Sequence, residues 1–359
     1  MEKFDRIRIG GLKVLEEGAC VESSSPLEDN RLGPAVCAPL AQQRLNLSFF
    51  THVAGDREVL CTASHNGEAA LALLQSRADP AASLALKPGT SILAVYPHDK
   101  RPEVIGTFIR SLARARVVIH GLASSPSAIS VVLSSSRIKP AVEQLFQHFT
   151  FPGFASPEEF YSAQAPPKEY LEKVVATYQE KVNKVYWIIP QPDLDLWGMS
   201  IATSDILAGF ADALMEMGQL GLAIPFLVAL PGLGGQEFIL SFSTARRQSG
   251  SHRLEACATG DHGSEVRRIL TNHLADIRPM RLTPVAGIFL HGPHFGDRYG
   301  IAHTLVSALA QAHIKLLALS CTISSISLII RQHELAAAQV ILGNTFAAPV
   351  ECAPTAAGG

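Results

Sequence analysis

Cysteine is scarce in this sequence, and the few residues present are too scattered to build a shared site. The six residues, Cys20, Cys37, Cys61, Cys257, Cys321 and Cys352, include no Cys-x-x-Cys pair. This spacing argues against a zinc site and against the disulfide framework of a small secreted protein. We therefore expect reduced, structural thiols.

The sequence also lacks an excess of charge of either sign. Lys and Arg total 30 against 32 Asp and Glu, and the basic residues are dispersed. A chain of this kind carries no electrostatic footprint for nucleic acid or for an anionic membrane. We expect a small molecule or a protein as its partner.

Long hydrophobic runs are missing as well. The N-terminal residues MEKFDRIRIGG alternate charged and apolar side chains, so they lack the apolar core of a secretory signal. The most apolar stretch, 220–233, is interrupted by Pro225 and Pro231 and is too short to cross a hydrocarbon layer of about 30 Å. These features predict a cytoplasmic protein outside the membrane.

Motifs for catalysis are absent or incomplete. No Ser-His-Asp or Cys-His arrangement has supporting context, and the PGLGGQ segment lacks the Lys and Ser or Thr of a phosphate loop. His291, His294, Asp297 and His303 cluster in sequence and offer metal-ligand chemistry, but their spacing matches no metal motif. We expect no cofactor, no metal and no enzyme, with the histidine cluster as the alternative.

What the sequence does contain is an internal repeat. Its clearest copy, 285–342, reads as a strand (VAGIFLHG), a loop (PHFGDRYG), a helix (IAHTLVSALAQAHI), two strands (KLLALSC, SISLIIR) and a second helix (HELAAAQVIL). In the first helix, Ile301, Leu305, Ala308 and Ala312 recur at helical spacing, which predicts one buried stripe. Repeats of this kind favour a binding role, because one active site rarely needs several equivalent modules.

The same order returns at 90–149, where Val104, Ile105, Phe108, Ile109 and Leu112 form the helical stripe. A copy near the N-terminus fits well except for its first strand, and a looser copy begins at KVYWIIPQ. The predicted domains are therefore residues 1–86, 87–150, 183–278 and 279–359. Residues 151–182 would form a linker with a helix, and 244–260 an insertion looping out of the third domain.

The repeat resembles the ACT domain. Each copy has about 60 to 80 residues, as an ACT domain does. The last copy is most similar to the regulatory modules of aspartate kinases, through the segments GDRYGIAHTLVSALAQAHIKLLAL and SISLII. The resemblance implies an α+β fold of four tandem βαββαβ (ferredoxin-like) modules. They would pair side by side into antiparallel sheets with helices on one face and bind an amino acid where two modules meet. Only about thirty residues precede the first repeat helix, so we expect no kinase domain.

The loop before a repeat helix suits an amino acid, because the leading helical N–H groups favour a carboxylate. In the last copy these amides belong to Tyr299, Gly300, Ile301 and Ala302. Asp297 would accept from the ammonium group, and Ser320, Thr322 and Ser324 would add side-chain oxygens. Alternatively, Asp297 caps the helix and Gly300 serves a turn that requires positive φ.

The second copy offers the corresponding residues Asp99, Pro102, Glu103, Val104, Ser124 and Ser125. The two serines precede Pro126 and are equally explained by a plain turn. The loops of the first and third copies differ in chemistry and contain Asn30, Arg31 and Gly33, or Asp193, Asp195, Trp197 and Gly198. We expect at most two good pockets among the four copies.

These patterns together predict a non-catalytic regulatory or sensor protein that binds a small ligand, in particular an amino acid, between modules. Its partner would be a separate enzyme, and the chain would form a homo-oligomer. Two alternatives stay open. The first is a ligand-free interaction scaffold or regulatory subunit, and the second is an enzyme that uses the histidine cluster.

Overall fold

The computed structural model describes residues 6–24, 36–55, 57–78, 82–163, 185–232, 235–243, 245–247, 254–256, 262–274, 277–292, 298–322 and 325–346. Within them, no helix is long and apolar enough to span a membrane.

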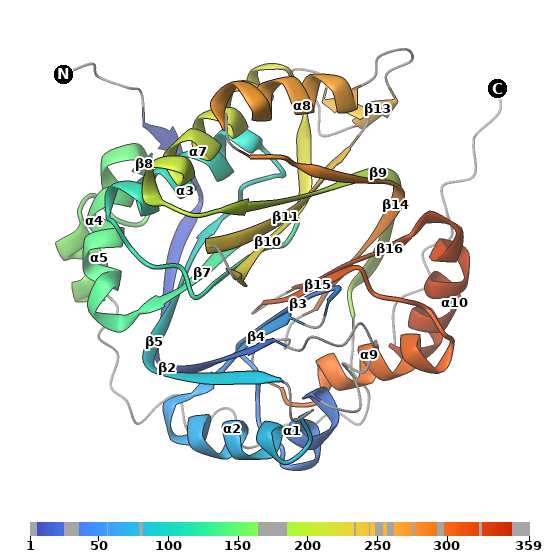
Figure 1. The fold of residues 1–359 in the computed structure, drawn as a ribbon. Coiled ribbons are helices and arrows are strands. Elements are labelled where there is room, and N and C mark those ends of the chain that lie inside the picture. Colours follow the sequence, from blue (N-terminus) through green and yellow to red (C-terminus); the bar gives the residue numbers. More distant parts are fainter. Residues whose placement is uncertain are drawn as a thin grey trace.

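Four units of the described chain repeat the order strand, helix, strand, strand, helix (Figure 1). The first unit contains β2 (Gly11–Ser24), α1 (Ala38–Gln42), β3 (Phe49–Val53), β4 (Arg57–Ala63) and α2 (Gly67–Gln75). The second contains β5 (Ser83–Tyr96), α3 (Pro102–Arg114), β6 (Gly121–Ser124), β7 (Ile129–Ser134) and α4 (Ile138–His148). The third contains β9 (Trp187–Ile201), α7 (Ser204–Gln219), β10 (Ala223–Gly232), β11 (Gly235–Ser243) and α8 (His262–His273). The fourth contains β14 (Met280–His291), α9 (Ile301–Gln311), β15 (Ala318–Cys321), β16 (Ser325–Arg331) and α10 (Leu335–Thr345).

Shorter elements lie between and within these units. They are β1 (Ile7–Arg8), which pairs with β8 (Phe149–Thr150), and α5 (Pro157–Ala163). A two-stranded ribbon, β12 (Ala245–Arg247) with β13 (Leu254–Ala256), lies within the insertion predicted at 244–260. One-turn helices η2 (Ser64–Asn66), η3 (Ser135–Arg137) and η4 (Gln332–Glu334) lead into α2, α4 and α10.

The helical stripes follow the spacing of apolar residues. In α3, the five predicted residues Val104, Ile105, Phe108, Ile109 and Leu112 are all fully buried, and Pro102 lies in the first turn, where its missing N–H costs nothing. The stripe predicted for α9 is correct only in its first half. Its buried residues are Ile301, Ala302, Leu305, Val306 and Leu309, whereas Ala308 is half-buried and Ala312 is exposed. Alanine side chains have little apolar area, so their spacing did not correctly predict which side of α9 is buried.

Twelve strands form one closed antiparallel ring, in the order β10-β11-β9-β14-β16-β15-β3-β4-β2-β5-β7-β6. Two edge contacts join the halves of the chain. β15 of the fourth unit pairs with β3 of the first, and β10 of the third pairs with β6 of the second. The units therefore associate as first with fourth and second with third.

Long strands link the two units within each half. The second part of β2 pairs with β4, while its beginning, 11–15, pairs with β5 beside the second unit. Likewise the beginning of β9, 187–191, pairs with β14 of the fourth unit. The last strand position of the second and fourth units is thus filled by a strand from earlier in the chain.

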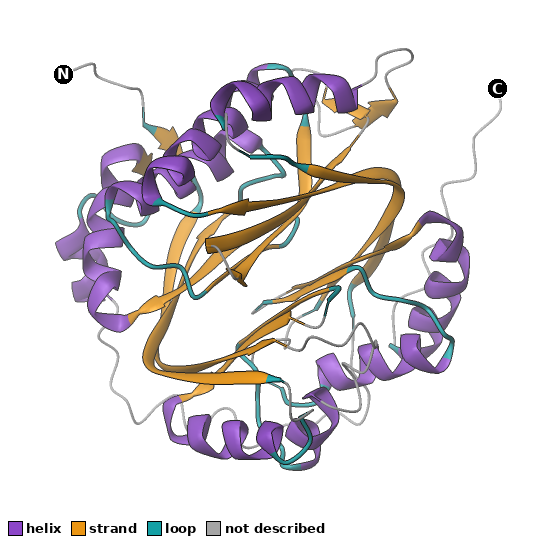
Figure 2. Ribbon diagram, viewed as in Figure 1, coloured by secondary structure: helices purple, strands orange, loops and turns teal. Residues whose placement is uncertain are grey.

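Helices cover the outside of the ring on two opposite sides, which gives four layers (Figure 2). One core lies under the helices of the second and third units and includes Phe108, Phe210 and Leu214. Another lies under those of the first and fourth units and includes Leu40, Leu305 and Leu342. A third cluster, with Phe49, Phe226 and Phe289, fills the space between the sheets. The pleat of the strands explains this division, because alternate residues face the helices and the inside of the ring.

Two expectations change with these long strands. Asp193, Asp195, Trp197 and Gly198, predicted to lie in a loop, belong to β9, where Asp195 binds Arg281 at 2.8 Å and Trp197 is fully buried. The Pro and Asp residues of PQPDLDLWGMSI resemble a loop, but Leu194, Leu196 and the residues after them continue a strand. β5 also crosses the boundary predicted at residue 86, because both units use this strand. The domain boundaries otherwise stay a prediction.

Candidate functional site

A pocket lies where the first and fourth units meet, between α1 and the N-terminus of α9. It is lined by Cys37, Leu40, Ala41, Leu45, Leu47, Arg298, Gly300, Ile301, Ala302, His303 and Cys321. The space between these residues, including the open mouth, is about 310 Å³. We call it the α1–α9 pocket.

The helix α9 presents its N-terminus to this pocket. Gly300 is the N-cap and has φ +83°, a left-handed conformation that favours glycine. Its carbonyl accepts hydrogen bonds from the N–H and the hydroxyl of Thr304. The leading N–H groups of a helix have no partner within the helix and carry its positive dipole end. The predicted residues Gly300, Ile301 and Ala302 therefore lie where a carboxylate would be stabilised.

Two buried thiols, Cys37 and Cys321, also line the pocket. Burial raises the pKa of Cys37 far above its ordinary value, with a smaller contribution from the carboxylate of Glu58. Burial raises the pKa of Cys321 to about 12. Both side chains are therefore neutral thiols at physiological pH and behave as small apolar groups.

A buried polar pair, His52 and Glu58, lies on the face of the sheet that carries the pocket residue Cys321. His52 of β3 and Glu58 of β4 are register partners, and His52 Nδ1 donates to Glu58 Oε1 at 3.2 Å. His52 follows two residues after Phe50, which pairs with the pocket residue Cys321. Among the described residues, none forms a hydrogen bond with Nε2 of His52.

The other residues predicted for the last copy are placed away from the pocket or outside the described chain. Ser320 Oγ donates to the carbonyl of Ser124 at 3.0 Å and so connects β15 with β6. Thr322 Oγ1 donates to the carbonyl of Ser325. Tyr299 precedes the N-cap and does not line the pocket. Asp297 and Ser324 lie outside the described residues.

In the second unit, the loop before α3 is closed by hydrogen bonds within the protein. The N–H of Lys100 donates to His98 Nδ1 at 3.0 Å, so Nε2 carries the proton and donates to the carbonyl of Ser125. Complete burial lowers the pKa of His98 to about 4, which keeps the imidazole neutral. The carbonyl of Lys100 accepts from Ile224 of β10 at 2.9 Å. Other groups of the protein therefore form the hydrogen bonds that this loop would otherwise offer to a ligand.

The predicted residues of that loop have structural roles. Asp99 has φ +51°, Pro102 begins α3, Glu103 forms an ion pair with Arg101 at 3.9 Å, and Val104 is fully buried. Ser125 Oγ accepts from the N–H of Ala128, which is the turn considered as the alternative. Ser124 is fully buried, and its hydroxyl has no hydrogen-bond partner among the described groups.

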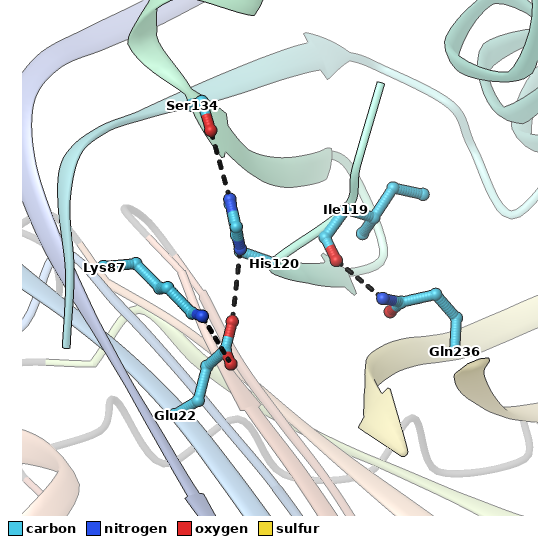
Figure 3. A network of polar contacts seen from close by, with 6 residues as sticks. All are labelled: Glu22, Lys87, Ile119, His120, Ser134 and Gln236. Atoms are coloured by element: carbon cyan, nitrogen blue, oxygen red, sulfur yellow. Dashed lines mark hydrogen bonds and ion pairs between the residues drawn. The ribbon is translucent and has the colours of Figure 1, made fainter. Parts of the chain in front are cut away.

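A separate polar network joins the first three units (Figure 3). His120 Nδ1 donates to Glu22 Oε1 at 3.1 Å, and His120 Nε2 lies 3.3 Å from Ser134 Oγ. Lys87 Nζ lies 3.9 Å from Glu22 Oε2, and nearby Gln236 of β11 donates to the carbonyl of Ile119 at 2.7 Å. This Ser-His-Glu chain was not recognised in the sequence, because 98 positions separate Glu22 from His120.

The histidines considered for a metal site have other contacts. His291 stacks on Trp187 with ring centroids 5.9 Å apart, whereas His303 Nδ1 lies 3.1 Å from Ser307 Oγ. His294 and Asp297 lie outside the described residues. No group of three or more potential ligands comes together in the part of the chain that the structure describes.

Comparison with known proteins bears on the fourth unit. Residues 284–344 match the ACT domain family. The matched segment includes the part of α9 that lines the pocket, together with β15 and β16. No curated protein sequence matches this chain.

Among solved structures, the aspartate kinase from Synechocystis is similar in fold, with a TM-score of 0.72 and 14% identity. The similarity covers 97% of this chain but 58% of the Synechocystis enzyme, so this chain corresponds to little more than half of that protein. The regulatory subunits of aspartate kinase from Thermus flavus and Thermus thermophilus cover 39% and 40% of this chain and 97% and 98% of their own chains. Each is 16% identical, with TM-scores of 0.36 and 0.37. The Synechocystis comparison shows that the fold of this chain is similar to that of the matched part of an aspartate kinase.

Sequence reasoning missed the residues that the first unit contributes to the pocket, Cys37, Leu40, Ala41, Leu45 and Leu47. It also missed Arg298, His303 and Cys321 on the other side. The missing information was which units pair. Had the first copy been placed against the fourth, the helix AVCAPLAQQR would have faced the loop before α9.

Proposed function

We propose that this chain is a non-catalytic regulatory protein of four ACT-like, ferredoxin-like modules that binds an amino acid in the α1–α9 pocket. The observation that carries the proposal is the position of this pocket. It lies at the junction of two units, and one wall is the helix N-terminus of the segment that matches the ACT domain.

The pocket provides complementary surroundings for the α-carboxylate and the side chain of an amino acid. The helix N-terminus and Arg298 provide positive potential for the α-carboxylate. Leu40, Leu45 and Leu47 provide apolar surface for a side chain. Because the two walls come from different units, a bound ligand contacts both and favours one packing of α1 against α9.

Regulation would follow from this difference in affinity between two packings. A ligand shifts a conformational equilibrium only by its differential binding, typically about 1–3 kcal/mol. The partner that responds to the shift would be an enzyme on a separate chain. The α3–α7 junction, where the loop is closed by His98, would remain unchanged.

A thermal-shift screen with the twenty amino acids tests the proposal on the full chain. Ligand at 100 times its Kd should stabilise the protein by about 2.7 kcal/mol. Ala41→Phe, which fills the pocket from the half-buried face of α1, should abolish the shift. Ala72→Phe, at an exposed position of α2 in the same unit, is the matched control and should retain it. If no amino acid shifts the transition, the scaffold alternative replaces the sensor.

One arrangement favours catalysis as a second candidate function. Ser134, His120 and Glu22 are connected like a serine hydrolase triad. We propose a structural role instead, because Glu22 is shared with Lys87 and the contacts join β2, β5 and β7. A fluorophosphonate probe should leave Ser134 unlabelled. Labelling that disappears in both Ser134→Ala and His120→Ala would contradict the non-catalytic assignment.

A further inference from the structure

The residues that line the α1–α9 pocket combine a few basic groups with an apolar majority. Arg298 and His303 are its only ionisable residues of basic type, and no Asp or Glu belongs to the described lining. Glu58 acts electrostatically on Cys37, but it is buried, hydrogen-bonded to His52 and absent from the lining. The described lining therefore offers no carboxylate to any cationic group of a ligand, whether that group is the α-ammonium group or a charged side chain.

The remaining surface is apolar. Leu40 is 1% exposed and belongs to the core under the helices, while Leu45 and Leu47 are half-buried and pack against that core. Cys37 and Cys321 add two neutral thiols, which cannot pair with a cation as thiolates would. A side chain that points away from α9 thus meets leucine, alanine and thiol groups.

On the basis of the proposed function, we infer that the pocket selects amino acids whose side chains are uncharged and apolar. A lysine side chain would bring an ammonium group against these leucines and lose hydration without gaining a charged partner among the described residues. An aspartate side chain would place a second carboxylate on the same apolar surface. Aliphatic or thioether side chains would instead remove apolar area from water.

Matched ligands test this inference by titration calorimetry on the full chain. Norleucine and lysine share a four-carbon side chain and differ by the terminal ammonium group, and leucine and aspartate form a second, branched pair. Norleucine should bind roughly tenfold or more tightly than lysine, and leucine should exceed aspartate by a similar factor. If lysine or aspartate binds as tightly as its apolar counterpart, the inference is wrong although the proposed function stands. If no amino acid binds, the proposed function itself fails.

A substitution in the apolar wall provides a second test. Leu47→Glu adds a carboxylate at a half-buried position and should shift the norleucine-to-lysine ratio toward lysine. Val118→Glu, at a position 67% exposed and outside the pocket, is the control and should leave the ratio unchanged. Ala41→Glu repeats the test on α1 if Leu47→Glu does not fold. An unchanged ratio in a folded pocket variant would overturn the inference.

Discussion

His98 lies in a loop whose position was predicted correctly, although no role was predicted for this residue. The loop HDKRPE precedes a repeat helix, as expected, but its imidazole satisfies the backbone of Lys100 and Ser125. Residue types and spacing alone could not reveal this, because the bond to Ser125 spans 27 positions. In the fourth unit, Arg298 and the N-cap Gly300, which lie at the corresponding position before α9, line a pocket instead.

The buried histidine makes a prediction about pH. The pKa of His98 is about 4 in the folded protein, mainly because of burial, against about 6.5 in an unfolded chain. Its stabilising contribution is complete above pH 6.5 and is lost as the pH falls toward 4, by about 3 kcal/mol in total. Urea unfolding at pH 7 and pH 4.5 should therefore show a smaller pH effect in His98→Gln than in the natural chain.

The exposed His65 provides the control for this experiment. His65→Gln should keep the pH dependence of the natural chain, because this substitution leaves the buried His98 and its hydrogen bonds in place. An identical pH dependence in His98→Gln and the natural chain would contradict the role given to His98.

At the scale of elements, sequence patterns predicted most helices and strands but not their lengths. The stripe of α3 is correct because Ile and Phe residues mark the buried face unambiguously. The first strands of the units were predicted too short, since β5, β9 and β14 continue past the turn-like Pro and Gly residues within them. These residues lie where a strand passes from one unit to the next, which short-range patterns cannot indicate.

The close contact between α3 and α7 predicts that a Gly→Ala substitution in a helix, which normally stabilises a protein, is destabilising at Gly106. A Cβ at Gly106 would lie 2.7 Å from the carbonyl oxygen of Ala211 and 3.0 Å from Met215. Gly106→Ala should destabilise the protein by roughly 1–3 kcal/mol, because the two helices would have to separate. Gly343 in α10 has open space at the same position, so Gly343→Ala should stabilise it by roughly 0.5–1 kcal/mol.

Denaturant unfolding of these two variants compares the same substitution in two helices. Because alanine is the better helix former, stabilisation by both variants would show that α3 and α7 do not pack as closely as described. Opposite signs are the expected result.

The whole molecule is not a row of separate repeats, because strands of one half of the chain pair with strands of the other half. β3 and β6 of the first half pair with β15 and β10 of the second, and residues from both halves fill the cluster between the sheets. The repeat was evident in the sequence, but the pairing was not, since strand edges carry no short-range signal of their partners. Closure within one chain also pairs edges that would otherwise be free. The expected homo-oligomer stays a prediction.

Dividing the chain should therefore leave two incomplete parts. Residues 1–182 and 183–359 each retain two units but leave two strand edges unpaired, which promotes association. Co-expressed fragments should purify as a one-to-one complex, and each fragment alone should aggregate or self-associate. Light scattering coupled to size-exclusion chromatography measures this. Two stable monomers that do not bind each other would contradict the closed ring.

The most direct measurement of the central claim is the stoichiometry of amino-acid binding by calorimetry on the full chain. We expect one site per chain, because the α1–α9 pocket is open to a ligand whereas the corresponding loop of the second unit is occupied by His98. Ala41→Phe should abolish this site, and Ala72→Phe should preserve it. Absence of binding by every amino acid, or binding that Ala41→Phe leaves unchanged, would contradict an amino-acid sensor that uses this pocket.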